Sequence, residues 1–353
     1  MKISATTAQP IPNRHIPFTL SLVLWLATVL LAEAAAASSV RNSIKQAHLL
    51  FRQGQWREAI DSLERLQPPQ AREQAEVYLA LGEMHLHDQR LAQAVTALEK
   101  AVHLCGDSSS CHRALGEAYA AQAVAADWIQ KIGLSKKIKL HLQRATRLDG
   151  NNFRARELLM QFYIHAPDFA GGDDAGAEEE CRQIEKGDAK RGLRARLKLL
   201  YLQKRWGEAG ERLKNAPPEL ASDPEVLNDL AGLQADRREF SEAFAILDKL
   251  IQAHPDYLSA RYQLGRTAAL SGQRTQDGIQ ALISYLKHHP HLEEPPIVWA
   301  HYRLGLLHAQ LGDSDRARRE YEQALERSPG HPKINAALKA LASKQSSRRS
   351  IRR

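Results

Sequence analysis

The chain has 353 residues, of which 43% are hydrophobic and only 6% aromatic, which excludes a core built on large aromatic side chains. The formal net charge is +8, and part of this excess is local because residues 344–353 carry five Lys or Arg and no acidic residue. Length does not fix the number of domains here, since a chain made of repeats grows by adding units.

The N-terminal segment predicts export from the cytoplasm. Lys2 and Arg14 precede an unbroken apolar stretch at residues 18–32, and alanines at 34–37 follow it. This is the layout of a secretory signal peptide, so residues 1–37 are predicted to be cleaved near Ser38. An uncleaved membrane anchor is the alternative, because residues 16–37 almost reach the roughly 20 apolar residues that span a bilayer. Either way, the remaining chain is expected in the periplasm or cell envelope.

One pattern of residues at fixed spacing, the repeat register, recurs along the rest of the chain, and its clearest copy is residues 298–331. Small residues stand where two helices cross closely, a large residue fills the neighbouring gap, and proline breaks the helix at the end. The positions are Leu304, Gly305, Ala317, Tyr321, Ala324 and Pro329. This pattern resembles the tetratricopeptide repeat, a two-helix unit of about 34 residues, and the resemblance extends over residues 39–343.

In chain order the register predicts eight units. They begin near Val40, Ala75, Leu115, Phe153, Leu193, Leu227, Leu264 and Val298. Because one unit cannot bury its apolar face alone, we expect an all-α, right-handed α-solenoid of about eight helix-turn-helix repeats. Residues 333–343 are predicted to form a C-terminal capping helix, so the solenoid spans 38–343, and residues 344–353 are predicted to be a disordered basic tail.

Two units are irregular. In the third, the second helix is expected at residues 136–152, about ten residues late, so either the first helix is extended by residues 124–134 or the turn is longer. In the fourth, residues 166–176 insert a proline and paired glycines, which predicts a loop. The acidic residues that follow, between Asp173 and Glu180, are expected to form a solvated first helical turn.

Three segments together point to a narrower group within the superfamily. Residues 115–119 (LGEAY), the late segment 134–139 (LSKKIK) and residues 160–172 (MQFYIHAPDFAGG) are in combination similar to a group of exported bacterial tetratricopeptide repeat proteins whose role is poorly described. That similarity implies an envelope setting and no established enzyme activity.

In the superfamily, ligands lie along the concave surface that the first helices form, at fixed positions of each unit. The residues that occupy such positions here are Glu83, Arg113, Glu117, Asn228, Tyr262, Arg266, Trp299 and Tyr302. The lysine and asparagine clamp of the chaperone-binding members is absent, so binding of chaperone tails is not expected. The three aromatic residues are candidate interface anchors, and the alternative is that they pack between repeats.

The cysteines allow one disulfide. Cys105 and Cys111 flank a short inter-helix turn, and an oxidising compartment would permit a bridge between them; the alternative is two small buried thiols. Cys181 is expected to be a packed thiol.

The sequence has no phosphate-binding loop, no zinc-protease motif and no nucleophile elbow, so we predict neither a catalytic residue, nor a metal site, nor a cofactor. The predicted function is a non-catalytic scaffold that binds a partner protein or peptide outside the cytoplasm. One alternative is a membrane-anchored envelope assembly factor. Another is an electrostatic binder of anionic polymer or nucleic acid through the basic tail, although export argues against nucleic acid. Neither the identity of the partner nor the oligomeric state follows from the sequence.

Overall fold

The computed structural model describes residues 34, 37–288 and 294–351, and every regular element within these ranges is a helix. The predicted signal peptide therefore lies almost wholly outside the described residues. So does the end of the basic tail, residues 352–353.

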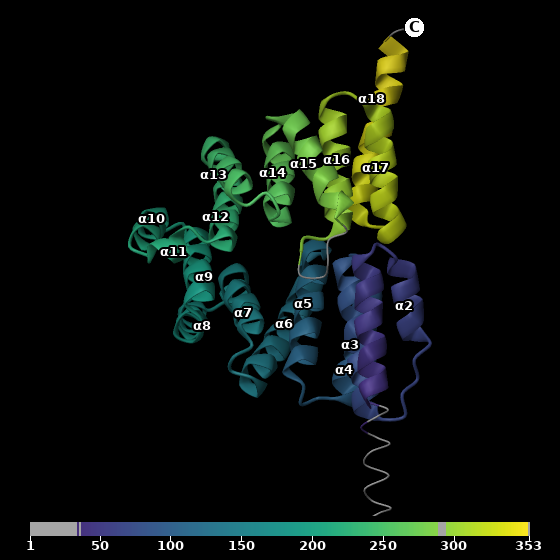
Figure 1. The fold of residues 1–353 in the computed structure, drawn as a ribbon, viewed down its shortest axis with the longest axis vertical. Coiled ribbons are helices and arrows are strands. Elements are labelled where there is room, and N and C mark those ends of the chain that lie inside the picture. Colours follow the sequence, from purple (N-terminus) through teal and green to yellow (C-terminus); the bar gives the residue numbers. More distant parts are fainter. Residues whose placement is uncertain (1–33, 35–36, 289–293, 352–353) are drawn as a thin grey trace, which may run out of the picture.

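The helices form eight antiparallel pairs and a cap, as the repeat register predicts (Figure 1). The first pair is residues 37–52 and α2 (Trp56–Glu64). The others are α3 (Ala71–His87) with α4 (Leu91–Leu104), α5 (Ser109–Ala125) with α6 (Trp128–Leu148), α7 (Phe153–His165) with α8 (Asp174–Gly187), α9 (Ala189–Leu202) with α10 (Trp206–Lys214), α12 (Pro224–Asp236) with α13 (Phe240–Ala253), α14 (Leu258–Ser271) with α15 (Thr275–Lys287), and α16 (Ile297–Gln310) with α17 (Ser314–Arg327). The cap is α18 (Pro332–Ile351), and two short helices, η1 (Asp168–Ala170) and α11 (Pro218–Ala221), lie in connections.

Close helix crossing explains the repeat register. A Cβ added to Gly82 would lie 2.4 Å from the side chain of Leu98, so only glycine lets α3 and α4 approach this closely. The same relation joins Gly265 to Leu282 at 2.2 Å and Gly305 to Tyr321 at 2.3 Å. In each of these three units the small residue therefore makes room for the large residue of the second helix.

The pairs are arranged in two layers. Each first helix contacts the next first helix, in the unbroken order α3, α5, α7, α9, α12, α14 and α16. The second helices pack mainly on their own first helix and on the following one, as α4 does on α3 and α5. The first helices therefore form a continuous inner surface, and the second helices spread apart on the outer, convex side.

The curved array closes on itself. Figure 1 shows α2 and α3 meeting α17, while α9 to α12 lie on the far side of the ring. Arg327 Nε lies 3.2 Å from Asp88 Oδ1, and both side chains are buried. Arg90 Nε donates to the Arg327 carbonyl at 2.6 Å, and Ser328 Oγ donates to the Gln89 carbonyl at 3.0 Å. Contacts across more than 230 residues of sequence thus join the second and eighth units.

The third unit departs from both sequence-based alternatives. Neither the first helix nor the turn is longer; instead α6 begins at Trp128, about eight residues before the expected start at Lys136. Asp127 accounts for the early start, because its Oδ1 accepts a hydrogen bond from the backbone N–H of Gln130 at 2.8 Å and caps the helix. α6 therefore has 21 residues, whereas α4, α13 and α17 have 14 each.

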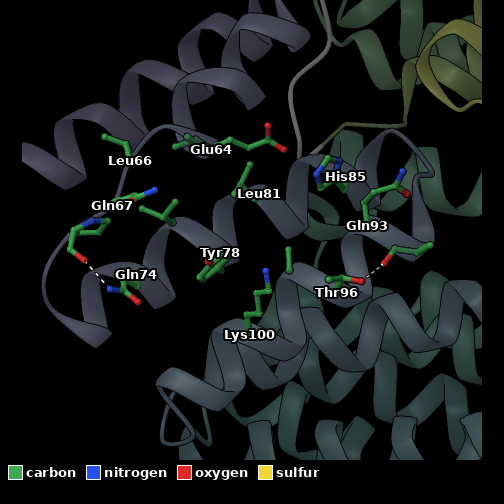
Figure 2. Close-up of a pocket in the computed structure, with 15 residues that line it drawn as sticks. Glu64, Leu66, Gln67, Gln74, Tyr78, Leu81, His85, Gln93, Thr96 and Lys100 are labelled. Atoms are coloured by element: carbon green, nitrogen blue, oxygen red, sulfur yellow. Dashed lines mark hydrogen bonds between the residues drawn. The ribbon is translucent and has the colours of Figure 1, made fainter.

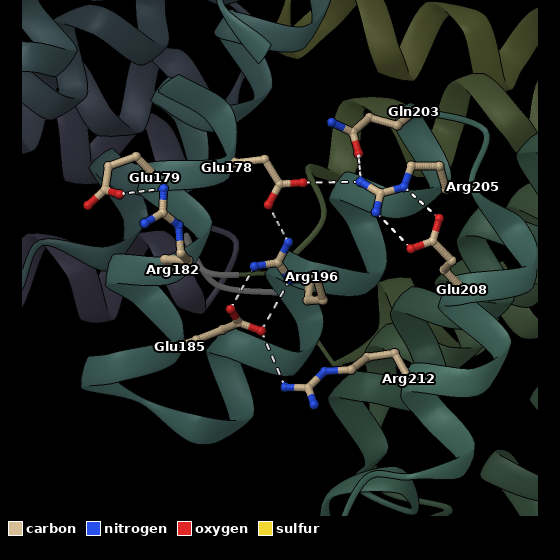
Figure 3. Close-up of polar contacts among 9 residues, drawn as sticks. All are labelled: Glu178, Glu179, Arg182, Glu185, Arg196, Gln203, Arg205, Glu208 and Arg212. Carbon is tan, nitrogen blue, oxygen red and sulfur yellow. Dashed lines mark hydrogen bonds and ion pairs between the residues drawn. The ribbon is translucent and has the colours of Figure 1, made fainter. Parts of the chain in front are cut away.

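The fourth unit contains the predicted loop, but its acidic residues are not simply solvated. Figure 3 shows Arg196 of α9 between Glu178 and Glu185 of α8, at 2.5 and 2.7 Å. Arg205 also lies 3.2 Å from Glu178. The expectation of a solvated acidic turn is wrong for Glu178, because arginines of the following unit bind it and hold α8 against α9.

The C-terminal helix is longer than the sequence predicts. α18 continues to Ile351, past Lys344, where the sequence predicts a disordered tail. No glycine or proline lies between residues 333 and 351, and lysine and arginine are good helix formers, so nothing in this segment ends the helix.

We expect Arg327→Ala to open the ring without unfolding the repeats. The substitution removes the arginine partner of the buried Asp88 carboxylate, whose other close contact is His87 Nδ1 at 3.7 Å. The loss costs about 3 kcal/mol, and opening returns that carboxylate to water. Distances between spin labels on α2 and α17 should lengthen and broaden. Adding Asp88→Ala should recover part of the closed population, and Arg57→Ala, which removes an exposed pair with Glu326, should have little effect. An unchanged distance distribution in Arg327→Ala would contradict this role of the buried pair.

Candidate functional site

A series of ion pairs runs along the inner surface from one first helix to the next. Glu83 of α3 pairs with Arg113 of α5, whose Nη1 also lies 3.1 Å from Glu117. Glu117 in turn pairs with Arg154 of α7. Three of the residues predicted from the superfamily register, Glu83, Arg113 and Glu117, therefore lie together on one surface, where they bind one another.

The inner surface deepens into a groove between the fourth and seventh units. It encloses about 320 Å³ and is lined by α7, α9, α12 and α14. Its lining side chains include Arg154, Glu157, Gln161, Arg194, Lys198, Asn228, Asp229, Asp236, Gln263 and Arg266. Two more of the predicted residues, Asn228 and Arg266, thus line this groove. Arg266 pairs with Asp236, and Arg194 Nε lies 2.6 Å from Asp229.

Three polar side chains in the groove have no partner among the described residues. Gln263 is only 8% exposed, and its Nε2 donates to nothing. The Oδ1 of Asn228 is buried and accepts nothing, and Lys198 makes no ion pair or hydrogen bond. Burial lowers the pKa of Lys198, and the nearby Asp229 opposes this effect. Unsatisfied buried polar groups are costly, so a hydrogen-bonding group placed in the groove would stabilise Asn228 and Gln263.

Glycine at position 232 keeps the groove hollow. A Cβ there would lie 3.3 Å from Gln263 Nε2, so a larger side chain would occupy the space that faces the free amide. Gly232 and Lys198 stand at the same register position of the sixth and fifth units, one without a side chain and one with a long cation.

Two residues of the groove, Arg194 and Lys198, are not among those predicted from the sequence. Both occupy first-helix positions of the fifth unit that are equivalent to Asn228 and Gly232 in the sixth, so the register that identified Asn228 also identifies them.

The predicted aromatic anchors are mostly packing residues. Tyr262 and Tyr302 are more than nine-tenths buried. The Tyr262 ring packs against Tyr285 at 5.2 Å, and its hydroxyl accepts a hydrogen bond from Arg303 at 2.6 Å. Their rings are unavailable to a partner, so the packing alternative holds for both. Trp299, partly buried, lies at right angles to Tyr302 at 5.7 Å, and its role as an anchor stays a prediction.

All three cysteines are free thiols in the structure, so the Cys105–Cys111 bridge is not formed. The Cys105 thiol instead donates to Asp107 at 3.0 Å, and this hydrogen bond, together with burial, raises its pKa to about 11. Burial raises the pKa of Cys111 and takes that of Cys181 to about 12. None of the three is a ready thiolate nucleophile.

A second depression, of about 630 Å³, lies between α2, α3 and α4 (Figure 2). α2 has nine residues and α4 fourteen, so the short α2 leaves part of α3 uncovered. His85 lines this depression, is almost fully buried, and has no partner for its Nδ1. Burial, reinforced by the positive charge of Arg90, lowers the His85 pKa to about 4.

Within the described ranges, no group of three His, Cys, Asp or Glu side chains has a geometry that could hold a metal ion. In the same part of the chain, no helix has the length and apolar character that a bilayer span needs.

Comparisons with known proteins agree with the helix pairs and their register. Two tetratricopeptide repeat models match the chain, one at residues 44–109 and one at 298–331. The chain belongs to the tetratricopeptide repeat superfamily. Tetratricopeptide repeats generally mediate protein–protein interactions, and the fold is typically a non-catalytic scaffold. The search of curated proteins found no match.

Solved structures similar to this tetratricopeptide repeat protein have low identity to it. A tetratricopeptide repeat protein from Parabacteroides merdae is 13% identical, with a TM-score of 0.42 over 86% of this chain and 99% of that one. The protein TTC0263 from Thermus thermophilus is 19% identical, with a TM-score of 0.42 over 65% and 98%. The human IFIT1 dimer with PPP-AAAA is 16% identical, with a TM-score of 0.40 over 79% and 66%.

Buried His85 should make the protein less stable in acid. Its folded pKa of about 4 is below the unfolded value of 6.5, so the unfolded state binds the proton first as pH falls. The free energy of unfolding should therefore drop by about 1.4 kcal/mol per pH unit between these values from this residue alone. Denaturant titrations from pH 7 to pH 4 measure the slope. His85→Leu should make it shallower by about that amount, and an unchanged slope would refute the assignment.

Proposed function

We propose that this protein is a non-catalytic scaffold outside the cytoplasm that holds an extended segment of a partner protein in the groove of α7, α9, α12 and α14. The observation that carries the proposal is that two buried polar atoms without a hydrogen bond, Asn228 Oδ1 and Gln263 Nε2, line the same hollow as the unpaired cation Lys198. A repeat fold supplies the setting, because a superhelix of paired helices presents its first helices as a continuous concave surface.

The chemistry of the three groups describes the partner segment. Gln263 offers a donor and Asn228 an acceptor, which suits the C=O and N–H groups of an extended backbone. Lys198 offers an unpaired cation, whereas Arg154, Arg194 and Arg266 are already paired with carboxylates. The segment should therefore carry one carboxylate, from a side chain or a chain end, at the level of α9.

Location outside the cytoplasm is part of the proposal and rests on the sequence of residues 1–37. Fractionation of the native cells and N-terminal sequencing test it. A mature chain that begins near Ser38 in the envelope supports cleavage and export, and an intact N-terminus in the envelope supports the anchored form. A cytoplasmic protein would contradict this part of the proposal.

Photocrosslinking in the native host tests the groove. A photoreactive residue at Gln161, which lines the groove, should capture a partner that the same residue at Lys249, exposed on the outer helix α13, does not. Lys198→Met should weaken binding of the captured segment about 10- to 100-fold, because it removes a charge-assisted hydrogen bond.

Gly232→Leu provides an independent test, because it fills the hollow without touching any charge. It should block capture while leaving the melting temperature nearly unchanged. Lys214→Met, at an exposed site on α10, is the matched control for Lys198→Met. Equal capture from both crosslinking positions, or full binding by Lys198→Met and Gly232→Leu, would contradict the groove proposal.

A further inference from the structure

The outer helix α6 presents an exposed stripe that contains both apolar and cationic side chains. Ile129, Gly133, Lys136, Leu140 and Arg144 recur every three or four residues, so they share one side of the helix, and all are exposed. The apolar members are large and open to solvent: Ile129 is 65% exposed and Leu140 63%. An exposed apolar stripe on a packed outer helix indicates a surface that another body covers.

The first turn of α6 stands clear of the rest of the fold. Residues 127–131 are exposed on every side because α6 starts well before the second helices of neighbouring units. Trp128, at this end, is 71% exposed. Nothing in the local structure requires a tryptophan here, since Asp127 alone supplies the helix cap.

The charge of α6 has one sign. Residues 128–148 contain six Lys or Arg and no acidic residue. Lys137 lies 3.9 Å from Glu99, and Lys139 donates to the Gly171 carbonyl at 3.4 Å. The other four cations form no ion pair with any described residue; they are Lys131, Lys136, Arg144 and Arg147. This contrasts with α9, whose Arg194 and Arg196 each bind two carboxylates.

The loop of the fourth unit adds one more apolar side chain beside α6. η1 contacts α6, and Phe169 within η1 is largely exposed. The loop is tightly built, because a Cβ on Gly172 would lie 2.0 Å from the Ala166 carbonyl oxygen, and the Asp173 N–H donates to the Tyr163 carbonyl at 3.0 Å. Phe169 is therefore held outward by a defined turn.

We propose that α6 docks the solenoid on a bilayer surface that contains anionic lipids. Trp128, Ile129 and Leu140 would enter the boundary between headgroups and acyl chains, while Lys136, Arg144 and Arg147 contact lipid phosphates. A helix of 21 residues offers about 30 Å of such surface. The stripe lies on the outer, convex layer. This layer cannot enclose a peptide, but its exposed helix α6 can contact the surface of a membrane. The docking surface is separate from the inner groove, so the solenoid can hold a partner while it lies on a bilayer.

A fluorescent probe at residue 133 tests the docking directly. Gly133 lies in the stripe, and an added Cβ there meets nothing within 4 Å, so Gly133→Cys accepts an NBD label without strain. Cys105→Ser removes the one native thiol that is not fully buried. The full chain is used, because this probe reports on α6 whether or not residues 18–32 also insert. Gly210→Cys, equally open and on α10, is the matched control position.

NBD emission from residue 133 should shift to the blue on vesicles of phosphatidylglycerol and phosphatidylcholine, and not on phosphatidylcholine alone, while residue 210 stays aqueous. Lys136→Gln with Arg144→Gln should weaken the response about 30-fold, from two lost lipid contacts. Lys214→Gln with Lys249→Gln should not. Trp128→Ala with Ile129→Ala should weaken it about tenfold or more. Raising salt from 0.01 M to 0.15 M should also weaken it, as the Debye length falls from about 30 to 8 Å.

Three outcomes would overturn the proposal: an aqueous probe at residue 133 on anionic vesicles, an equal response on both lipid compositions, or an undiminished response in the Lys136→Gln, Arg144→Gln variant. A response to soluble polyglutamate without a response to anionic vesicles would also overturn it, and would indicate an acidic protein partner instead.

Discussion

The buried ion pair between Asp88 and Arg327 sets the shape on which both surfaces of this protein depend. A solenoid of eight two-helix units contacts only its neighbours, so its curvature is the sum of small rotations and is free to vary. Here the second and eighth units meet, and the buried ion pair between Asp88 and Arg327 holds them together. This contact sets the total curvature of the array. The inner layer of first helices therefore forms a closed ring, which includes the groove between α7 and α14.

The inner and outer layers of the ring expose different kinds of side chain. On the inner layer, carboxylates and cations of successive first helices neutralise one another, whereas Lys198 forms no ion pair and Asn228 and Gln263 each keep a buried polar atom without a hydrogen bond. On the outer layer, second helices spread apart, and each exposes one side. α6 alone among the helices compared above is lengthened at its start, and this extension carries Trp128 and Ile129. The proposed partner site and the proposed membrane surface thus lie on different layers of one fold.

Ionic contacts supplement the apolar core that joins the units. α8 is bound to α9 and α10 through Arg196, Arg205 and Arg212, which share Glu178 and Glu185. The apolar core itself crosses unit boundaries, because one buried cluster joins residues of α4 to α9 and another joins residues of α12 to α16. Paired in this way, the charges add specificity to the stacking where a purely apolar interface would tolerate slippage.

The sequence by itself determined the class of the fold, the number of units and part of the inner surface, namely Glu83, Arg113, Glu117, Asn228 and Arg266. The first two follow from local physics, because only glycine fits at position 305, where the large side chain of Tyr321 approaches within one unit. Tertiary structure decided what the register does not encode. It buried Tyr262 and Tyr302, left Asn228 and Gln263 without partners, started α6 at Trp128 and brought Asp88 to Arg327. Each of these depends on the rotations between successive units, which add up along the array. The sequence of a single repeat does not encode that total.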